Sequence, residues 1–165
     1  MIFETSLRKD SSNMDMKIGN SLPDITLKNQ DNELVTLHDF IGKNPLVIYF
    51  YPKDETPGCI REACTFRDQF ENFTEIGAQV FGVSSDSVSS HKRFATKYRL
   101  NFQLLSDPDK KAEKAFEVPR RLLGLLPGRV TYVFDKKGQL IHEFNSSLYP
   151  AKHIREAMEA LKKAS

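Results

Sequence analysis

The only two cysteines of the 165-residue chain, Cys59 and Cys64, lie five positions apart in the segment YFYPKDETPGCIREACTFRD (49–68). Thr56 suits the N-cap of a helix and Pro57 its first position, so Cys59 would be the third helical residue. There its sulfur would lie near unpaired backbone N–H groups and the positive end of the helix dipole, which favour a thiolate. We therefore predict that Cys59 is a nucleophile rather than a small apolar residue in a helix start.

The spacing of the two cysteines bears on whether they form a disulfide. Five residues of an α-helix rise about 7.5 Å and turn about 140°, which places the two Cα atoms roughly 8.5 Å apart. A disulfide rarely joins Cα atoms more than about 7 Å apart. A permanent bridge within a helix is therefore not expected. We predict that the thiols are apart when reduced and join only after the first helical turns unwind.

Metal binding is a competing use for a cysteine pair. Structural zinc sites typically have gaps of about two to four residues between cysteines and need further Cys or His ligands. The chain has no second cysteine pair, and we expect no metal site. We interpret each of the scattered histidines as a surface residue or a polar group at a strand end: His38, His91, His142 and His153. Lys53 and Arg61 are close to Cys59 in the sequence and could add positive charge.

The composition is typical of a soluble globular protein, with 39% hydrophobic and 28% charged residues. A net charge of +2 without a stripe of Lys and Arg gives little support to nucleic-acid binding. The longest apolar run, LVIYFY (46–51), is far shorter than the roughly 20 residues of a membrane helix. No signal or transit peptide is evident, which predicts a cytoplasmic protein. We expect residues 1–15 to be a flexible leader and 16–165 to be one domain.

Hydrophobic periodicity and turn signals predict alternating strands and helices. The run NPLVIYFYP (44–52) is apolar, which indicates a central strand buried on both faces. Phe66, Phe70 and Phe73 recur at helical spacing, so one helix is expected from TPG to Gly77. The other expected elements are a hairpin within 24–40, a strand over 78–86, a helix over 87–100, a strand over 102–109, a short helix over 110–118, a hairpin over 129–144 and a helix over 150–164. This order predicts an α/β sandwich with a mixed sheet and an N-terminal β-hairpin, which suits a thioredoxin-like core.

The segment PKDETPGC (52–59) resembles the Pro-x-x-x-Thr-x-x-Cys active-site motif of the peroxiredoxins, thiol peroxidases on a thioredoxin-like fold. A second cysteine five residues later is similar to the Q-type subfamily, also called bacterioferritin comigratory protein. Two further segments, SSDSVSSHKRFATKYRLNFQLLSD (84–107) and LLPGRVTYVFDKKG (125–138), resemble the same subfamily. The resemblance covers roughly residues 17–163 and implies a central mixed β-sheet flanked by helices.

The resemblance implies roles for individual residues. Cys59 would be the peroxidatic cysteine, which attacks the peroxide and becomes a sulfenic acid, and Cys64 the resolving cysteine that condenses with it to a disulfide. Pro52 would shield the pocket, and Thr56 would hydrogen-bond the peroxide and the thiolate. Arg129 would hold the thiolate ionised. Such fixed donors would also stabilise the negative charge that develops on the departing oxygen.

Arg129 and Glu62 each have a second interpretation. Arginine suits a thiolate because it is permanently charged and has planar donors, but in the sequence alone Arg129 could equally be a surface charge at a strand edge. Glu62 could orient that arginine, as the resemblance implies, or it could be a solvated charge on a helix.

The expected activity is reduction of hydrogen peroxide and organic hydroperoxides, with the disulfide recycled by thioredoxin or a similar dithiol donor. No cofactor is implied, and we expect a monomer that binds neither nucleic acid nor membranes. Two alternatives stay open. A general disulfide reductase usually has a Cys-x-x-Cys pair, which this chain lacks, and a redox sensor would turn over little. The loop VPRRLLGLLPG (118–128) is either a pocket wall, a partner surface or a core-packing loop.

Overall fold

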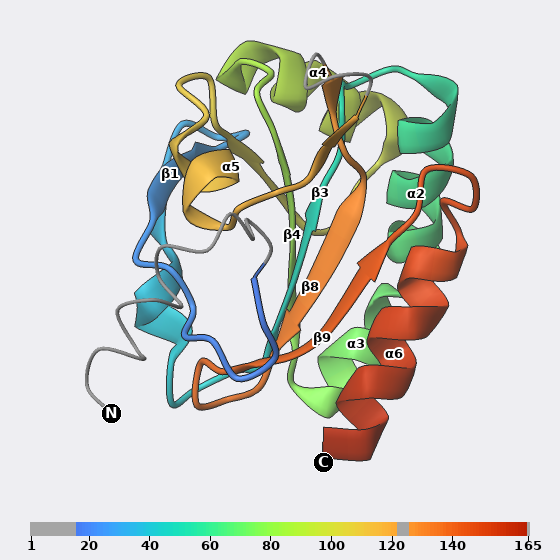
Figure 1. Ribbon diagram of the computed structural model, residues 1–165. Helices are drawn as coiled ribbons and strands as arrows, with labels where there is room; N and C mark the ends of the chain where they lie inside the picture. The colour runs from blue at the N-terminus through green and yellow to red at the C-terminus, as the bar shows by residue number, and fades with distance from the viewer. Residues whose placement is uncertain (1–15, 122–125, 165) are drawn as a thin grey trace.

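The computed structural model describes residues 16–121 and 126–164 (Figure 1). The predicted leader, residues 1–15, and positions 122–125 of the 118–128 loop lie outside the described residues. In chain order the elements are β1 (Thr26–Asn29), β2 (Leu34–Thr36), the 3-10 helix η1 (Leu37–Phe40), β3 (Leu46–Phe50), α2 (Pro57–Asp68), α3 (Phe70–Ile76), β4 (Gln79–Ser84), α4 (Val88–Tyr98), β5 (Gln103–Ser106), α5 (Lys111–Ala115), β6 (Arg120–Arg121), β7 (Leu126–Pro127), β8 (Val130–Phe134), β9 (Leu140–Asn145) and α6 (Lys152–Ala164).

Seven strands form one mixed sheet in the order β2-β1-β5-β4-β3-β8-β9. β3, β4 and β5 run parallel, and the other neighbouring pairs are antiparallel. β3 lies inside the sheet, and all five of its residues are buried. An apolar strand gains most from that position because both of its faces are covered. The predicted mixed sheet is confirmed, and the predicted N-terminal hairpin, β1 and β2, forms one edge of it.

Alternating side chains of β3 divide the core into two layers. Val47 and Tyr49 face the layer that the helices α2, α3, α4 and α6 cover, whereas Ile48 faces the layer that η1 and α5 cover. Figure 1 shows α2, α3 and α6 together on one side of the sheet and α5 on the other. The helices contribute these large buried side chains to the first layer: Phe66, Phe73, Phe94, Ile154 and Leu161. Among the described residues, no helix is long and apolar enough to span a membrane.

The single helix predicted to run as far as Gly77 is wrong, because the structure divides it in two. α2 ends at Asp68 and α3 begins at Phe70, with Gln69 between them at φ −100° and ψ 6°. The Gln69 N–H still donates to the Thr65 carbonyl at 3.1 Å, so the chain bends without losing its helical bonding. Gly77 ends α3 in the left-handed conformation (φ +86°), as a C-cap glycine does.

The register of β3 against β8 places distant residues together. Phe50, the last residue of β3, pairs with Val130, the first residue of β8. The loop that leads into α2 therefore leaves the sheet where the chain enters β8. This juxtaposition brings Arg129 to Cys59, 70 positions earlier in the chain.

Candidate active site

Cys59 lies in the first turn of α2, as predicted. The helix begins at Pro57, and Thr56 precedes it in an extended conformation (φ −86°, ψ 148°). Cys59 is thus the third helical residue. It is 1% exposed and packs in the same apolar layer as Tyr49 and Ala63. The nucleophile predicted from the sequence is therefore buried, not open to solvent.

Arg129 joins Cys59 to a buried acid. Its Nη2 donates to Cys59 Sγ at 3.4 Å, and its Nη1 donates to Glu62 Oε1 at 2.6 Å. Glu62 is 0% exposed and Arg129 is 7% exposed. The alternative interpretations of these two residues, a surface charge and a solvated helix charge, are therefore wrong. These two contacts, one from each terminal nitrogen, fix where the guanidinium lies.

Burial and charge act in opposite directions on the Cys59 sulfur. Burial raises the pKa of Cys59 above its usual value. The charge of Arg129, the Thr56 side chain and the Lys53 backbone lower this pKa, but together they do not outweigh burial. The side chains of Lys53 and Arg61 are exposed, and the cation that contacts the sulfur is Arg129. Desolvation thus opposes the stabilisation of the thiolate that the start of the helix gives. Thiolate formation in this arrangement therefore depends on Arg129.

The Arg129–Glu62 pair has one partner that titrates near neutral pH. Burial raises the pKa of Glu62 to about 8, in spite of the neighbouring Arg129. Burial acts to lower the pKa of Arg129, but the charges of Glu62 and Cys59 outweigh it and raise the pKa. Arg129 therefore stays charged, and Glu62 is the group whose protonation changes.

Glu62 Oε2 is buried on the far side of this ion pair. It has no hydrogen-bond partner among the described residues and lies 3.5 Å from Nδ1 of His153. His153 is 0% exposed, and burial lowers its pKa to about 4, so the ring is neutral at physiological pH. A neutral ring gives Glu62 no counter-charge from this side, which is consistent with its raised pKa.

Thr56 and Pro52 lie in the loop between β3 and α2. Thr56 occupies the N-cap position, but its hydroxyl does not cap the helix. Instead Thr56 Oγ1 donates to the Lys53 carbonyl at 2.9 Å, and the same side chain acts on the Cys59 thiol by lowering its pKa. Pro52 is half-buried in this loop, directly after Tyr51. The structure thus brings Thr56 to the nucleophile through a turn within the loop rather than through helix capping.

Cys64 lies further along α2 and is half-buried. Both cysteines are free thiols, and both lie inside the same helix. Helix geometry keeps their Cα atoms roughly 8.5 Å apart, beyond the span of a disulfide. The structure therefore shows the separated arrangement that the spacing predicts for the reduced pair.

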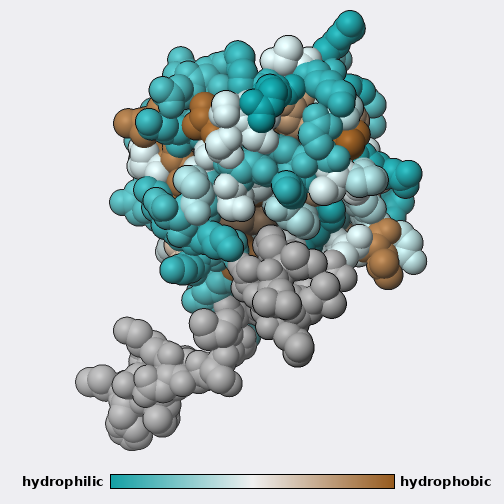
Figure 2. Space-filling model, turned by 90° about the horizontal axis from the view of Figure 1, so that it is seen from above, coloured by the Kyte–Doolittle hydropathy of each residue, from teal (hydrophilic) through white to brown (hydrophobic). Residues whose placement is uncertain are grey.

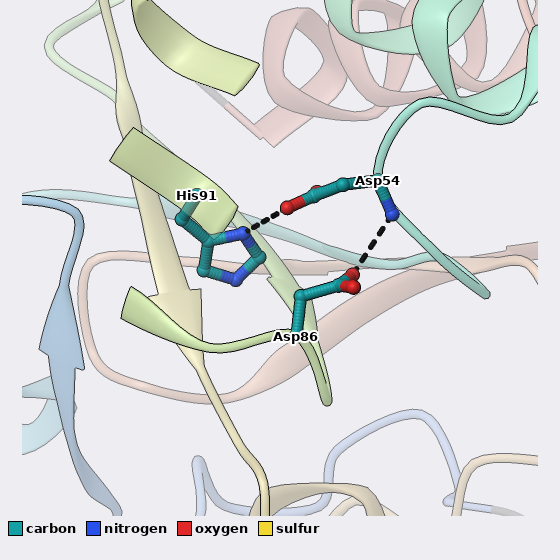
Figure 3. Close-up of side chains that lie close together, drawn as sticks. All are labelled: Asp54, Asp86 and His91. Atoms are coloured by element: carbon teal, nitrogen blue, oxygen red, sulfur yellow. Dashed lines mark hydrogen bonds and ion pairs between the residues drawn. The ribbon is translucent and has the colours of Figure 1, made fainter. Parts of the chain in front are cut away.

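A second buried network holds the loop between β3 and α2 (Figure 3). Asp54 accepts hydrogen bonds from Tyr51 Oη at 2.6 Å and from Ser90 Oγ at 2.8 Å, and it lies 2.8 Å from His91 Nδ1. The Asp54 N–H donates to Asp86 Oδ2 at 2.8 Å. These contacts tie the loop to α4 and to the end of β4, and so fix the direction in which α2 starts.

The same network contains atoms that could hold a metal ion. Ligand atoms of Asp54, Asp86 and His91 lie within 4.8 Å of one another. Each side chain is already engaged, since Asp86 Oδ2 also accepts from Ser84 Oγ at 2.6 Å and His91 Nε2 donates to the Leu105 carbonyl at 3.1 Å. Side chains whose polar atoms bond one another this fully fit a structural network better than a metal site.

Two histidines differ from their sequence-based interpretation. His91 and His153 are both 0% exposed, so their interpretation as surface or strand-end groups is wrong. A signal was available for His91, because it precedes the buried Phe94 and Ala95 by three and four positions on the inward face of α4.

Gly58 is a site residue that the sequence analysis did not single out. A Cβ atom there would lie 2.8 Å from Arg129 Nη2 and 3.6 Å from Pro150 Cγ. Glycine thus lets the guanidinium approach the start of α2. No local pattern reveals this requirement, because the neighbour that demands it lies next to β8.

Known proteins are similar to this chain in sequence and in fold. Residues 18–143 match the AhpC/TSA family. The chain is 51% identical over 143 residues to "Peroxiredoxin Q, chloroplastic" of Triticum aestivum, covering 87% of this chain and 65% of that one. It is 50% identical over 155 residues to the protein of the same name from Sedum lineare, covering 94% and 83%. A crystal structure of the bacterioferritin comigratory protein of Xanthomonas campestris superposes with a TM-score of 0.79 at 32% identity, covering 88% and 99%.

These similarities confirm the predicted fold and the predicted family. The chain spans just under two thirds of the length of the Triticum aestivum relative, so the activity of that whole protein does not transfer directly. The matched region nevertheless includes both cysteines, Glu62 and Arg129. The chain belongs to the AhpC/TSA family, as a peroxiredoxin of the Q type.

Proposed function

We propose that the chain is a thiol-dependent peroxidase that reduces hydrogen peroxide and organic hydroperoxides. The observation that carries this proposal is the single guanidinium of Arg129, which contacts both Cys59 Sγ and the buried Glu62 at the start of a helix. The similar bacterioferritin comigratory protein of Xanthomonas campestris has an alkyl peroxide reduction activity, which supports the same chemistry here.

The reaction has three steps. The Cys59 thiolate attacks one peroxide oxygen, the O–O bond breaks, and Cys59 becomes a sulfenic acid while the other oxygen leaves as alcohol or water after taking up a proton. The Cys64 thiol then attacks the sulfenic sulfur and displaces water, which leaves a Cys59–Cys64 disulfide. Thioredoxin or a similar dithiol donates two electrons, restores both thiols and becomes oxidised itself.

Arg129 has the donors that this chemistry needs. Its charge favours the thiolate before attack and stabilises the negative charge on the departing oxygen during attack. Its Nε is buried without a hydrogen-bond partner among the described residues, which leaves one N–H available for an oxygen atom. The Thr56 hydroxyl, held at the Lys53 carbonyl, is the second polar group that acts on the sulfur, and we assign to the half-buried Pro52 the shielding of the pocket.

The first test is the intact mass of the protein after one equivalent of hydrogen peroxide. Wild type should lose two hydrogen atoms as the disulfide forms. The Cys64→Ser variant should gain one oxygen atom as a trappable sulfenic acid. No mass change in either protein would refute the proposal, and consumption of only one peroxide per protein with a dithiol present would favour a sensor over an enzyme.

The setting of the reaction is also a proposal. We infer a cytoplasmic protein that acts as a monomer and recycles its disulfide with thioredoxin or a similar dithiol donor. The contact between Arg129 and Cys59 supports peroxides and a thiol reductant as partners, and the lack of a stripe of basic residues gives little support to nucleic acid.

A further inference from the structure

A shallow groove of about 300 Å³ lies beside the active site, between α2 and the segment that joins β9 to α6. Figure 1 shows this joining loop next to the start of α2. Pro150 lines the groove, and its Cγ lies 3.6 Å from the position of a Cβ on Gly58. Arg61, which also lines the groove, lies in α2 two positions after Cys59, so a molecule in this groove would contact the helix that contains Cys59.

The groove has an exposed apolar part. Leu148 is 78% exposed and Tyr149 is 62% exposed, and both line the groove. The space-filling view in Figure 2 shows that hydrophobic residues are scattered among hydrophilic ones on the face that it presents. The other exposed large hydrophobic residues of the described chain, Ile18, Leu34 and Ile41, lie before β3. Tyrosine gives a contact surface a large amphipathic side chain at low entropic cost, and Leu148 adds apolar area beside it.

The rest of the groove is positively charged. Arg61, Lys152 and Arg155 line it, all three are exposed, and no carboxylate is among the lining residues. Within the described ranges, none of these cations has an ion-pair partner, and Lys152 only lies over the Phe144 ring at 5.7 Å. A partner that fits this surface would have an apolar centre and carboxylates at its rim.

We propose that this surface, Arg61, Leu148, Tyr149, Lys152 and Arg155, docks the protein dithiol that reduces the Cys59–Cys64 disulfide. We call it the reductant face. The proposal rests on the proposed function. Arg61 lies between the two cysteines and moves with the segment that unwinds on oxidation, whereas Leu148, Tyr149, Lys152 and Arg155 lie outside that segment and keep the face beside the disulfide loop. A protein dithiol must bring its thiolate to one sulfur of that loop, whereas hydrogen peroxide needs no such surface.

Reduction at this face is a thiol–disulfide exchange in two steps. A thiolate of the docked dithiol attacks one sulfur of the Cys59–Cys64 disulfide and releases the other as a thiolate, which gives a mixed disulfide. The second thiol of the donor then attacks the mixed disulfide. Two electrons pass to this chain, both of its cysteines become thiols, and the donor leaves as a disulfide.

The test compares a protein dithiol with a small one. Two double variants, Leu148→Ser/Tyr149→Ser and Arg61→Glu/Arg155→Glu, are assayed with thioredoxin, its reductase and NADPH, and separately with dithiothreitol. The expected result is a rise of about tenfold or more in KM for thioredoxin, because hot-spot contacts and charge complementarity are lost. Turnover with dithiothreitol and single-turnover oxidation by hydrogen peroxide should change less than about twofold, which excludes damage to the fold.

A matched control carries the same chemical changes elsewhere on the surface. Leu34→Ser/Lys137→Glu removes an exposed leucine and reverses an exposed charge at two positions that do not line the groove, and KM for thioredoxin should not change. Added salt should raise KM for thioredoxin in wild type and have less effect on Arg61→Glu/Arg155→Glu, because the cations are already gone.

Three outcomes would contradict the proposal that the reductant face docks a protein dithiol. One is an unchanged KM for thioredoxin in both double variants. Another is a rate of the double variants that changes with cumene hydroperoxide but not with hydrogen peroxide, which would assign the groove to the organic part of the peroxide. The last is turnover with dithiothreitol but with neither thioredoxin nor glutaredoxin. Absence of turnover with dithiothreitol in wild type is distinguishable from these, because it refutes the proposed function itself.

Discussion

The reactivity of Cys59 is set by a competition between desolvation and one cation. The sulfur is 1% exposed, and burial raises the pKa of Cys59. Arg129 opposes that effect from 3.4 Å, and Glu62 holds the guanidinium in place from its other side. A single residue next to β8 therefore decides how much thiolate is present at neutral pH.

Arg129→Met should shift the pH dependence of peroxide reduction. Because only the thiolate reacts, the rate rises with pH through the pKa of Cys59, and loss of the cation moves this rise to higher pH. At neutral pH the second-order rate constant with hydrogen peroxide should fall about 100-fold, as for other lost charge-stabilising donors. Stopped-flow measurements across pH on wild type, Arg129→Met and Arg129→Lys test this, with Lys retaining part of the rate. An unshifted profile in Arg129→Met contradicts the assignment.

Gly58→Ala should lower activity without lowering stability. The added Cβ would lie 2.8 Å from Arg129 Nη2, which Cys59 and Glu62 hold in place, so the guanidinium must move. Alanine also has less conformational freedom than glycine in the unfolded chain, which offsets the cost of the displacement by about 0.4–1 kcal/mol. We expect a rate loss of about tenfold or more with an equal or higher unfolding temperature. Equal activity in the variant would show that Arg129 tolerates displacement.

At the scale of elements, α2 must be helical for one step of the reaction and must open for another. As a helix it holds Cys59 at its start beside Arg129, and it keeps Cys64 beyond disulfide distance. To form the disulfide, its first turns must open. The loop before it is anchored separately by Asp54, Tyr51 and His91, so α2 can unwind while that loop stays fixed.

Oxidation should reduce hydrogen-exchange protection in α2. Amides over 57–66 lose helical bonds when the cysteines join, whereas those of α6 (Lys152–Ala164) keep them. Exchange measured by mass spectrometry on reduced and peroxide-treated protein tests this. The Cys64→Ser variant treated identically is the control, because it cannot form the disulfide. Equal protection of 57–66 in both states would mean that the thiols join by another motion.

Asp54→Asn should destabilise the protein and lower its activity together. Asparagine removes the charge that accepts the buried hydrogen bonds of Tyr51 and Ser90 and lies beside His91, at a cost of about 1–3 kcal/mol. Urea unfolding of Asp54→Asn, His91→Gln and the double variant should show non-additive losses, because the two residues share one network. His142→Gln, which removes a half-buried histidine paired with Glu156, is the matched control and should lose less than about 1 kcal/mol. Additive losses would show that the pair is not coupled.

At the scale of the whole molecule, the sheet separates two apolar layers. Arg129 and Glu62, the only buried Arg–Glu pair among the described residues, lie on the side of the helix-covered layer. Glu62 lies in the helix-covered layer, where burial raises its pKa from the ordinary 4.5 to about 8. The folded protein therefore binds a proton at Glu62 that the unfolded chain releases. Site chemistry and global stability are linked through this one carboxyl group.

The free energy of unfolding should depend on pH through Glu62. The folded-state pKa is the higher one, so the protonated form contributes stability that is complete below about 4.5 and is lost as pH rises through about 8. Glu62→Gln lacks this loss. Between about pH 5 and pH 8 it should gain on the order of 1–3 kcal/mol relative to wild type in urea unfolding. The exposed Glu159→Gln should show no such trend, and a parallel trend in both variants would contradict the link.

Much of this site was predictable because it is local. The helix start at Thr56 and Pro57, the position of Cys59 in the first turn and the separation of Cys59 from Cys64 follow from backbone geometry within a dozen residues. The unbroken apolar run of β3 likewise predicted a strand inside the sheet. The bend at Gln69 was not predictable, since the helical spacing of apolar side chains continues through it.

The sequence by itself predicted which cysteine is the nucleophile and which is its partner, and it determined most of the strands and helices that contain them and, through resemblance, the family. Only the tertiary structure decided that Arg129 reaches Cys59, that Glu62, His91 and His153 are buried, and that Thr56 bonds the Lys53 carbonyl instead of capping α2. The physical reason is that capping positions and periodicity depend on neighbours in the chain. Desolvation and charge pairing depend on which surfaces meet, and here the register of β3 against β8 decides that.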